Sequence, residues 1–321
     1  MGTILVTGAY GQVGRELIPE LERRYGTENV IISDVIPAPP DLSRFRSSRI
    51  DVSNGDSIVH AIDEFHVDSI FHLAAILSAT GEKNPQKAFQ INLIGTYNVL
   101  EAGLKKNLSK IMIPSTIGVF GKETPKRNVP VDTVTKPRTM YGVTKVATEI
   151  LGNYYFHRFG LDVRGLRFPG LISYSAMPGG GTTDYSVEMF HYAVEGKKYT
   201  CFLREDSMLP MMYMPDAINA FLQLYEADIS RLTHHTDYNI SAFSFTPKDL
   251  EKAIQNRIPE FAVEYAPDFR QSIADSWPET IDHSEASKDW GFSFRYDLEK
   301  MVDDMITNLR KLKRVEIKNR A

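Results

Sequence analysis

The N-terminal segment places a short apolar strand directly before a turn with regularly spaced glycines. Residues Thr3–Thr7 are rich in β-branched side chains, and Gly8-x-x-Gly11-x-x-Gly14 follows at once. Gly8 can make a tight turn, Gly11 lets backbone approach a phosphate, and Gly14 lets the next helix pack closely on the strand. The segment therefore predicts a strand, turn and helix that bind a dinucleotide at the helix N-terminus. Its spacing differs from the commoner Gly-x-Gly-x-x-Gly, so three ordinary turn glycines are the alternative.

A second apolar run supplies the acidic residue that such a site needs. Val30–Ser33 ends at Asp34, about 20 residues after the last glycine of the turn. A carboxylate there accepts hydrogen bonds from an adenosine ribose and repels a 2′-phosphate, so we expect NAD rather than NADP. After a third strand, Asp51 would meet the adenine and Val52 would pack against its ring. A solvated loop acid is the alternative for Asp51.

Short β-rich runs alternate with helical patterns through the first half of the chain. We expect strands near residues 3–7, 30–34, 47–51, 68–73, 110–114 and 162–167. This alternation is typical of an α/β fold with a doubly wound parallel sheet, whose ligand lies beyond the carboxyl ends of the strands. After about residue 170 the pattern becomes irregular, and Tyr238–Ser241 is expected as the last strand. Substrate-specific structure is expected in this second half.

Composition excludes several classes of protein and of site. The 321 residues carry a net charge of −4, and a protein with this charge lacks the basic surface that is typical of nucleic-acid binding. The single cysteine, Cys201, excludes an internal disulfide and is expected to pack as a small apolar residue in a reducing compartment. The eight histidines are scattered, so we expect no metal site, and His72 is expected to be a packed strand residue. With neither a signal peptide nor a membrane span in view, a cytoplasmic protein is expected.

A phenol, an ammonium and a hydroxyl make the strongest chemical pattern. Tyr141 and Lys145 stand four residues apart, and thus on one face of a helix expected over 140–159. A lysine beside a tyrosine favours the phenolate, whose ordinary pKa of about 10 is too high for a base near neutral pH. Any amphipathic helix can carry such a pair by chance. Ser115 and Thr116, however, follow an apolar run that ends at the same sheet edge as the expected cofactor.

Five motifs in order make the chain similar to the extended short-chain dehydrogenase/reductase family. They are Gly8-x-x-Gly11-x-x-Gly14, His72-Leu-Ala-Ala75, Asn92-Leu-Ile-Gly95-Thr96, Ser115-Thr116-x-x-Val119-Phe120-Gly121 and Tyr141-x-x-x-Lys145. The resemblance implies a Rossmann NAD-binding domain over residues 1–170 with return segments near 213–241. It implies a smaller C-terminal substrate domain from 171–212 and 242–312, followed by a basic tail over 313–321.

One sequence difference from the sugar-nucleotide enzymes of this family narrows the range of expected substrates. Those members commonly carry an arginine on the substrate diphosphate where this chain has Leu209, so UDP-sugars lose their charged partner. The segment 209–216, with 179–185 and 238–247, resembles the short-chain L-threonine 3-dehydrogenases. That resemblance implies NAD-dependent oxidation of L-threonine at C3 to 2-amino-3-oxobutanoate. Another extended short-chain oxidoreductase, a sugar-nucleotide epimerase and a non-catalytic NAD-binding regulator are the alternatives.

The resemblance also implies roles for individual residues. Tyr141 would be the general base, Lys145 would lower its pKa and bind the nicotinamide ribose, and Thr116 would orient the alcohol. The expected contacts of NAD are Gly8, Tyr10, Gly11, Gln12, Val13, Gly14, Asp34, Val35, Asp51, Val52, Leu73, Ala74, Ala75, Asn92, Tyr141, Lys145 and Leu171. The expected contacts of threonine are Ser78, Thr116, Tyr141, Thr182, Thr183 and Asp184. Helix N-capping is the alternative for Thr182 and Thr183.

Two further expectations concern assembly and motion. Helical patterns at about 86–106 and 140–159 carry apolar residues on more than one face, among them Phe89, Tyr97 and Tyr154. The resemblance implies a homodimer through a four-helix bundle, and burial under the second domain is the alternative. The glycines at 179–181 suggest a hinge that closes over substrate.

Overall fold

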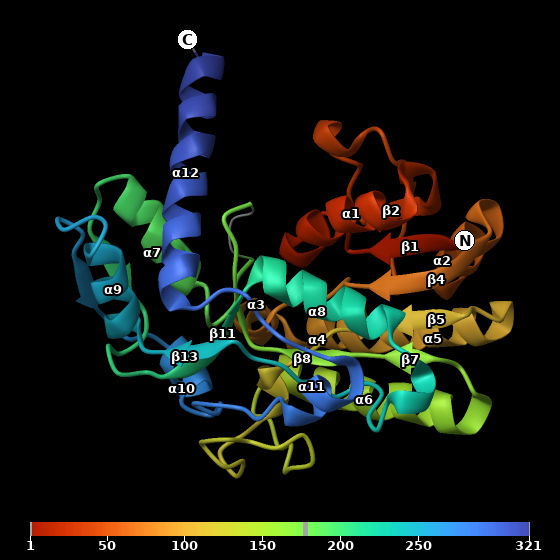
Figure 1. Ribbon diagram of the computed structural model, residues 1–321. Helices are drawn as coiled ribbons and strands as arrows, with labels where there is room; N and C mark the ends of the chain where they lie inside the picture. The colour runs from red at the N-terminus through yellow and green to blue at the C-terminus, as the bar shows by residue number, and fades with distance from the viewer. Residues whose placement is uncertain (1, 176–178, 321) are drawn as a thin grey trace.

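A parallel sheet forms the centre of the molecule (Figure 1). The structure is a computed structural model that describes residues 2–175 and 179–320, and the side chains up to residue 313. The strand order is β3-β2-β1-β4-β5-β7. Their bounds are β1 (Thr3–Thr7), β2 (Val30–Asp34), β3 (Arg46–Arg49), β4 (Val67–His72), β5 (Lys110–Met112) and β7 (Val163–Arg164). All neighbouring strands in this sheet are parallel, so their carboxyl ends meet at one edge.

Three short strands continue the sheet beyond that edge. β6 (Ser115–Thr116), β8 (Leu166–Phe168) and β12 (Tyr238–Asn239) pair in the order β12-β8-β6. Pro114 has no N–H and separates β6 from β5, while Gly165 separates β8 from β7. The Gly165 N–H donates to the carbonyl of His235 over 2.7 Å, which ties the continuation to the chain that enters β12. Ser115 and Thr116 are thereby carried past the main sheet.

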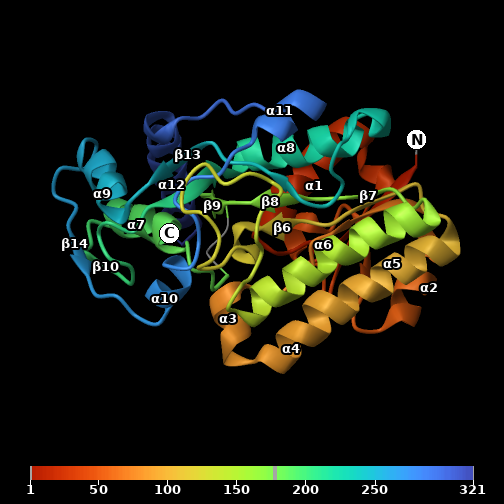
Figure 2. The same cartoon turned by 90° about the horizontal axis from the view of Figure 1, so that it is seen from below.

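Helices cover both faces of the sheet. α2 (Gly55–Phe65), α5 (Gly95–Lys106) and α6 (Met140–Phe159) pack on one face, where α5 and α6 lie side by side (Figure 2). α1 (Gln12–Tyr25), α8 (Met214–Glu226) and α11 (Ser284–Trp290) pack on the other. A π-helical turn, Gln90–Ile94, joins α4 (Pro85–Phe89) to α5, and α3 (Ser78–Lys83) precedes α4. The expected doubly wound α/β fold is confirmed.

The C-terminal half adds a second lobe with its own buried core. Its strands are β9 (Gly170–Ile172), β10 (Tyr199–Cys201), β11 (Leu209–Tyr213), β13 (Phe243–Phe245) and β14 (Val263–Tyr265). Its helices are α7 (Tyr185–Val194), α9 (Pro247–Gln255), α10 (Arg270–Ala274) and α12 (Leu298–Arg320). β11 pairs with β9, which begins two residues after β8, so this lobe grows out of the last strands of the sheet. The last turns of α12 project away from both lobes (Figure 1).

Five of the six expected strands and both long helical patterns are present with small differences at their ends, whereas the strand expected at 162–167 is divided at Gly165 into β7 and β8. β3 ends at Arg49, so Asp51 lies in a turn after the strand rather than at its end. The strand expected at 238–241 stops at Asn239, and it is not the last strand, because β13 and β14 follow it. The basic tail continues α12 to Arg320, and its side chains from residue 314 lie outside the described part of the chain. The exact domain boundaries stay a prediction.

The glycine turn can be tested by its effect on stability. Gly8 has a φ of +63°, and an added Cβ would lie 2.6 Å from the backbone nitrogen of Ala74. Gly8→Ala should therefore lower the free energy of unfolding by roughly 3 kcal/mol, from left-handed strain plus overpacking. Urea unfolding checks this value. Gly160→Ala is the matched control, since its φ is +71° but nothing lies within 4 Å. Equal losses in the two variants would contradict the packing explanation.

Candidate active site

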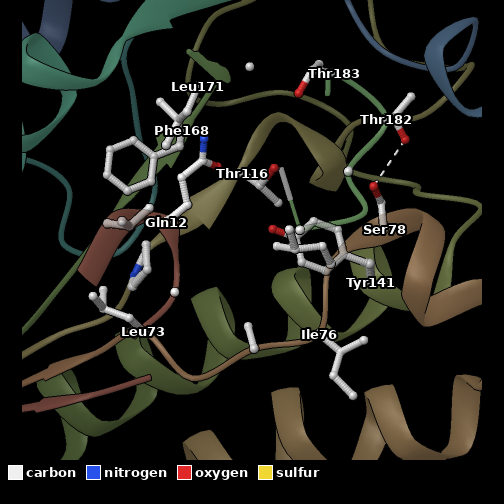
Figure 3. A pocket seen from close by; sticks show the side chains of 18 of the residues that line it. Gln12, Leu73, Ile76, Ser78, Thr116, Tyr141, Phe168, Leu171, Thr182 and Thr183 are labelled. Carbon is white, nitrogen blue, oxygen red and sulfur yellow. Dashed lines mark hydrogen bonds between the residues drawn. The ribbon is translucent and has the colours of Figure 1, made fainter. Parts of the chain in front are cut away.

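A cavity of about 490 Å³ lies at the carboxyl edge of the sheet, where the two lobes meet. One side of it carries Gln12, Phe168 and Leu171, and the other carries Ser78, Tyr141 and Thr182 (Figure 3). Residues from the glycine turn, from the segments after β4 and β5, from α6 and from the start of α7 all contribute to the wall. A ligand here would touch both lobes, as expected for a parallel sheet of this order.

The glycine turn forms a cradle that side chains would fill. A Cβ on Gly8 would meet Ala74, and one on Gly14 would lie 2.4 Å from the carbonyl oxygen of Ala9. Gly11 is the N-cap residue of α1 and offers no side-chain cap, so the first N–H groups of the helix are open to a ligand. The Nε2 atom of Gln12 is buried without a hydrogen-bond partner. These features fit the phosphates of a dinucleotide.

Asp34 lies beside this cradle but outside the cavity wall. Its carboxylate accepts hydrogen bonds from the backbone N–H of Tyr10, over 3.2 Å, and of Val35, over 2.7 Å. Asp51 accepts from the N–H and the hydroxyl of Ser53. Val52 is buried in the core under α5, where a Cβ on Gly95 would touch it. The adenosine contacts expected of these residues stay predictions.

Asn92 holds the cavity wall and does not line it. Its side-chain amide accepts from the N–H of Ile76 over 2.7 Å and donates to the carbonyl of the same residue over 3.0 Å. Asn92 sits in the π-helical turn, a geometry that is frequent near functional sites. It thereby fixes the segment Ala75–Leu77, and all three residues of this segment line the cavity. The expected direct contact of Asn92 with NAD stays a prediction.

His72 is a neutral structural residue, as expected. Its Nδ1 atom lies 2.8 Å from the Thr7 hydroxyl and its Nε2 atom 3.1 Å from the Thr96 hydroxyl. Because Thr96 donates to the carbonyl of Asn92, its oxygen accepts from Nε2–H, and Nδ1 accepts from Thr7. Burial, together with the positive charge of Lys145, lowers the pKa of His72 to about 3.

Tyr141, Thr116 and Lys145 come together on the cavity wall. Thr139 caps α6 by accepting from the N–H of Gly142, which starts the helix one residue before Tyr141. The Tyr141 ring packs on Gly118, where a Cβ would lie 3.3 Å from the ring. The Thr116 hydroxyl accepts from the N–H of Gly118 over 3.1 Å and is hydrogen-bonded to the phenol. The three expected functional groups therefore share one site.

The electrostatics of this group differ from the simple expectation. Burial raises the pKa of Tyr141 to about 12, and the hydrogen bond from Thr116 opposes that rise. Burial lowers the pKa of Lys145 to about 8, and the charge of Glu149 opposes that fall. The Lys145 ammonium donates to the carbonyl of Pro114 over 2.7 Å and stands 6.0 Å from the Tyr141 ring centre. Burial therefore has the larger effect on the Tyr141 pKa, and the group that opposes it is Thr116 rather than the expected Lys145.

The four residues expected at the substrate end all line the cavity. The hydroxyls of Ser78 and Thr182 lie 3.1 Å apart and bridge α3 to the segment before α7 (Figure 3). One Asp184 carboxylate oxygen accepts from the N–H groups of Gly180 and Gly181. Burial raises the pKa of Asp184 to about 6, which leaves it largely ionised at neutral pH. Thr182 and Thr183 do not cap a helix, because the N-cap residue of α7 is Asp184 and no side chain caps this helix.

Trp277 is a wall residue that no sequence motif indicated. It is 5% exposed and reaches the cavity from the turn after α10. The Lys126 ammonium donates to the carbonyls of Asp275, over 2.6 Å, and Trp277, over 2.7 Å. Its only sequence signal is that tryptophan occurs just twice in the chain. Ile76, Leu77, Thr80 and Ile117 are further wall residues that the sequence analysis does not predict.

Other expectations about sites can be compared with the described residues. Cys201 is buried and burial raises the pKa of its thiol to about 11, which makes it unreactive. Among the described side chains, those of residues 2–175 and 179–313, no cluster suits a metal ion. In the same part of the chain no helix is long and apolar enough to cross a membrane. The cytoplasmic location stays a prediction.

Comparison with known proteins identifies relatives that match almost end to end. The sequence model of the NAD dependent epimerase/dehydratase family matches residues 4–241. An uncharacterised epimerase/dehydratase of Staphylococcus haemolyticus is 44% identical over 309 residues, which cover 95% of this chain and 97% of that protein. The GalE-like L-threonine dehydrogenase from Cupriavidus necator, in its holo form, has a TM-score of 0.94 and 45% identity, covering 96% of this chain and 99% of its own. A monomeric L-threonine 3-dehydrogenase from a metagenome has a TM-score of 0.94 and 45% identity, covering 97% and 99%. The chain belongs to the NAD dependent epimerase/dehydratase family.

Proposed function

We propose that this protein is an NAD-dependent L-threonine 3-dehydrogenase that oxidises C3 of L-threonine to give 2-amino-3-oxobutanoate. The observation that carries the proposal is one cavity that joins the glycine turn, the Tyr141 and Thr116 pair, and the polar residues before α7. The similarity at 45% identity to two structures named as L-threonine dehydrogenases supports the choice of substrate.

The cofactor end of the cavity suits NAD. The turn at Gly8 and the open first turn of α1 suit the diphosphate, and the carboxylate of Asp34 suits an unphosphorylated ribose. Lys145 uses one of its three donors on Pro114, which leaves two for the ribose next to the nicotinamide. Leu171 lines the cavity where the nicotinamide ring would pack. When bound, NAD supplies a hydride acceptor with a positively charged ring.

Tyr141 handles the proton of the reaction. The O–H bond at C3 breaks as its proton passes to the Tyr141 oxygen, and the C=O bond forms as hydride leaves C3. A phenol with a pKa near 12 is a poor base at neutral pH, so the charged form needs help. Thr116 and the Lys145 ammonium supply it, by a hydrogen bond to the phenolate and by a nearby positive charge. Thr116 also orients the alcohol.

The polar end of the cavity suits a small zwitterion better than a diphosphate. Lys145 is the one cation among the described residues of the wall, and it is placed beside Tyr141. Leu209, which stands where sugar-nucleotide enzymes carry arginine, is 1% exposed in the core of the second lobe. Asp184 would face the ammonium of threonine, and the hydroxyls of Ser78, Thr182 and Thr183 would hold its carboxylate.

Substrate choice can be measured directly. With NAD and a sole substrate, L-threonine should give NADH at the highest kcat/KM, followed by L-serine, because serine lacks the methyl group that the apolar wall would contact. One lost methyl group should cost about 10-fold to 200-fold in kcat/KM. Absorbance of NADH follows the reaction. A UDP-sugar and 3-hydroxybutyrate are the comparison substrates. Absence of NADH with threonine would sink the proposal.

The role of Tyr141 has its own test. Tyr141→Phe should lower kcat by at least about 100-fold, because the general base is lost, while the dissociation constant of NADH stays within a few-fold. Stopped-flow turnover and nicotinamide fluorescence measure the two quantities. Tyr192→Phe is the control, since Tyr192 is an exposed tyrosine of α7 that lies outside the cavity wall and outside the helices α5 and α6. Near-normal turnover of Tyr141→Phe would show that another group acts as the general base.

We further propose that the protein forms a homodimer through α5 and α6. Val143, Ile150 and Tyr154 are exposed along one stripe of α6, and Phe89 and Tyr97 are exposed on the neighbouring α4 and α5. The two long helices lie side by side on the outside of the molecule (Figure 2). A row of exposed apolar side chains on adjacent helices is typical of a four-helix interface between two copies. The similar metagenome protein, by contrast, is described as monomeric.

Sedimentation decides the oligomeric state. The protein should sediment at twice the chain mass of 36.3 kDa, and Ile150→Glu should convert it to the single-chain mass, because a charge would be buried at the interface. Ile229→Glu is the control, since Ile229 is exposed on a different surface, in the turn after α8. A single-chain mass for the unmodified protein would contradict the dimer and leave the proposed activity untouched.

A further inference from the structure

A buried ion pair lies directly beneath the group of Tyr141, Thr116 and Lys145. Glu149 is one helical turn after Lys145 on α6, and Arg167 is the central residue of β8. The guanidinium donates to both carboxylate oxygens, each over 2.9 Å. Glu149 is 6% exposed and Arg167 is 3% exposed. Such a bidentate pair has a fixed geometry as well as opposite charges.

The pair is tied to the strand that carries the reactive hydroxyl. The Ser115 hydroxyl donates a hydrogen bond to the Glu149 carboxylate. On either side of Ser115, the Pro114 carbonyl accepts from the Lys145 ammonium and the Thr116 hydroxyl is bonded to Tyr141. Three consecutive residues, Pro114 and the two residues of β6, therefore bind Lys145, Glu149 and Tyr141 respectively. Moving Glu149 would move all three contacts.

Arg167 fixes the far side of the carboxylate. It donates to the carbonyl of Val131 over 2.9 Å and to the side-chain oxygen of Asn239 over 3.3 Å. Asn239 in turn donates to the carbonyl of Val129 over 3.0 Å. Because the guanidinium and the Ser115 hydroxyl both donate hydrogen bonds to Glu149, these bonds favour the ionised form of its carboxylate. Burial outweighs these bonds, however, and leaves the pKa of Glu149 above its ordinary value.

Stability alone does not account for this arrangement. Removing two charges from water costs several kcal/mol per ion, and a buried pair often stabilises no more than apolar residues of the same volume. A second bidentate pair joins buried Arg164, on β7, to partly buried Asp162, with both bonds at 2.8 Å. That pair anchors the carbonyls of Leu224 and Ala227 and lies away from the cavity wall. Of the two pairs, Glu149 with Arg167 is the one joined to the site.

We propose that Glu149, held by Arg167, is a positioning residue that sets the place of Lys145 and Thr116 relative to Tyr141 and keeps the Lys145 ammonium charged in the working pH range. This inference deepens the proposed dehydrogenase activity and rests on it. Lys145 is needed as an ammonium because only the charged form stabilises the Tyr141 phenolate.

The charges around Lys145 support this role. Tyr141 and Glu149 approach it along α6, and His72 approaches from β4 in its neutral form. Arg167 on β8, and Asp237 beyond it at 3.9 Å from Arg167, lie on the far side of Glu149. Burial lowers the pKa of Lys145 to about 8, and Glu149 is the group that holds it from falling further. Without the Glu149 charge, Lys145 should lose its proton at a lower pH.

The test is the pH profile of kcat/KM for L-threonine in Glu149→Gln. Glutamine can still accept from Ser115, but it carries no charge. The alkaline fall of kcat/KM should move toward acid by about one pH unit, because a close opposite charge shifts a pKa by roughly that amount or more. At the pH of the wild-type midpoint, kcat/KM should fall several-fold. NADH affinity, measured by nicotinamide fluorescence at pH 6.5, where Lys145 is charged in both proteins, should change less than threefold.

Controls separate the possible outcomes. Asp162→Asn breaks the pair with Arg164 and should lower thermal stability without moving the alkaline fall of kcat/KM. If Glu149→Gln does not fold, Glu149→Gln with Arg167→Gln is measured instead, since it leaves no unpaired buried charge and should show the same acid shift. A folded variant with an unmoved alkaline fall would overturn the inference. Wild-type protein without NADH formation would instead overturn the proposed function.

Discussion

The close approach of backbone to backbone at the carboxyl edge of the sheet is the constraint on which the site depends. A Cβ on Gly8 would meet Ala74, and one on Gly142 would lie 2.2 Å from the carbonyl oxygen of Gly118. The first contact presses the glycine turn against the segment after β4, and the second presses the start of α6 against the turn after β6. Together they bring a helix N-terminus and a tyrosine to the same cavity. Larger side chains at either contact would separate the elements and open the site.

Burial is the second theme, because it sets the chemistry of every ionisable group at this edge. It raises the pKa of Tyr141, lowers that of Lys145 and keeps His72 neutral. The protein opposes these shifts with specific partners, a hydroxyl for Tyr141 and the charge of Glu149 for Lys145. In a water-poor cavity these partners act more strongly than they would in solvent. The same burial that makes an unassisted phenol a weak base therefore makes its assistance effective.

The residues that sequence reasoning found share a property, which is a position close in the chain to a strand end or to a motif of regular spacing. Gly8, Thr116, Tyr141 and Lys145 belong to this group, and all line one cavity. Trp277 could not be found in this way, because it reaches the cavity through contacts of Lys126 with distant carbonyls. The importance of Asn92 as a clamp on Ile76, and of Arg167 as a partner of Glu149, likewise depends on elements that meet only after folding.

The sequence by itself determined the class of fold, the edge of the sheet at which a ligand lies and the set of reactive side chains. These features depend on local periodicity and on spacing along one strand or one helix turn, and both can be read from the sequence. The tertiary structure decided which side chains face the cavity, which of them clamp its walls and how far each pKa moves. Those properties depend on burial and on partners far apart in the chain, such as Ser78 with Thr182 and Glu149 with Arg167. Spacing along the chain does not specify such distances in space.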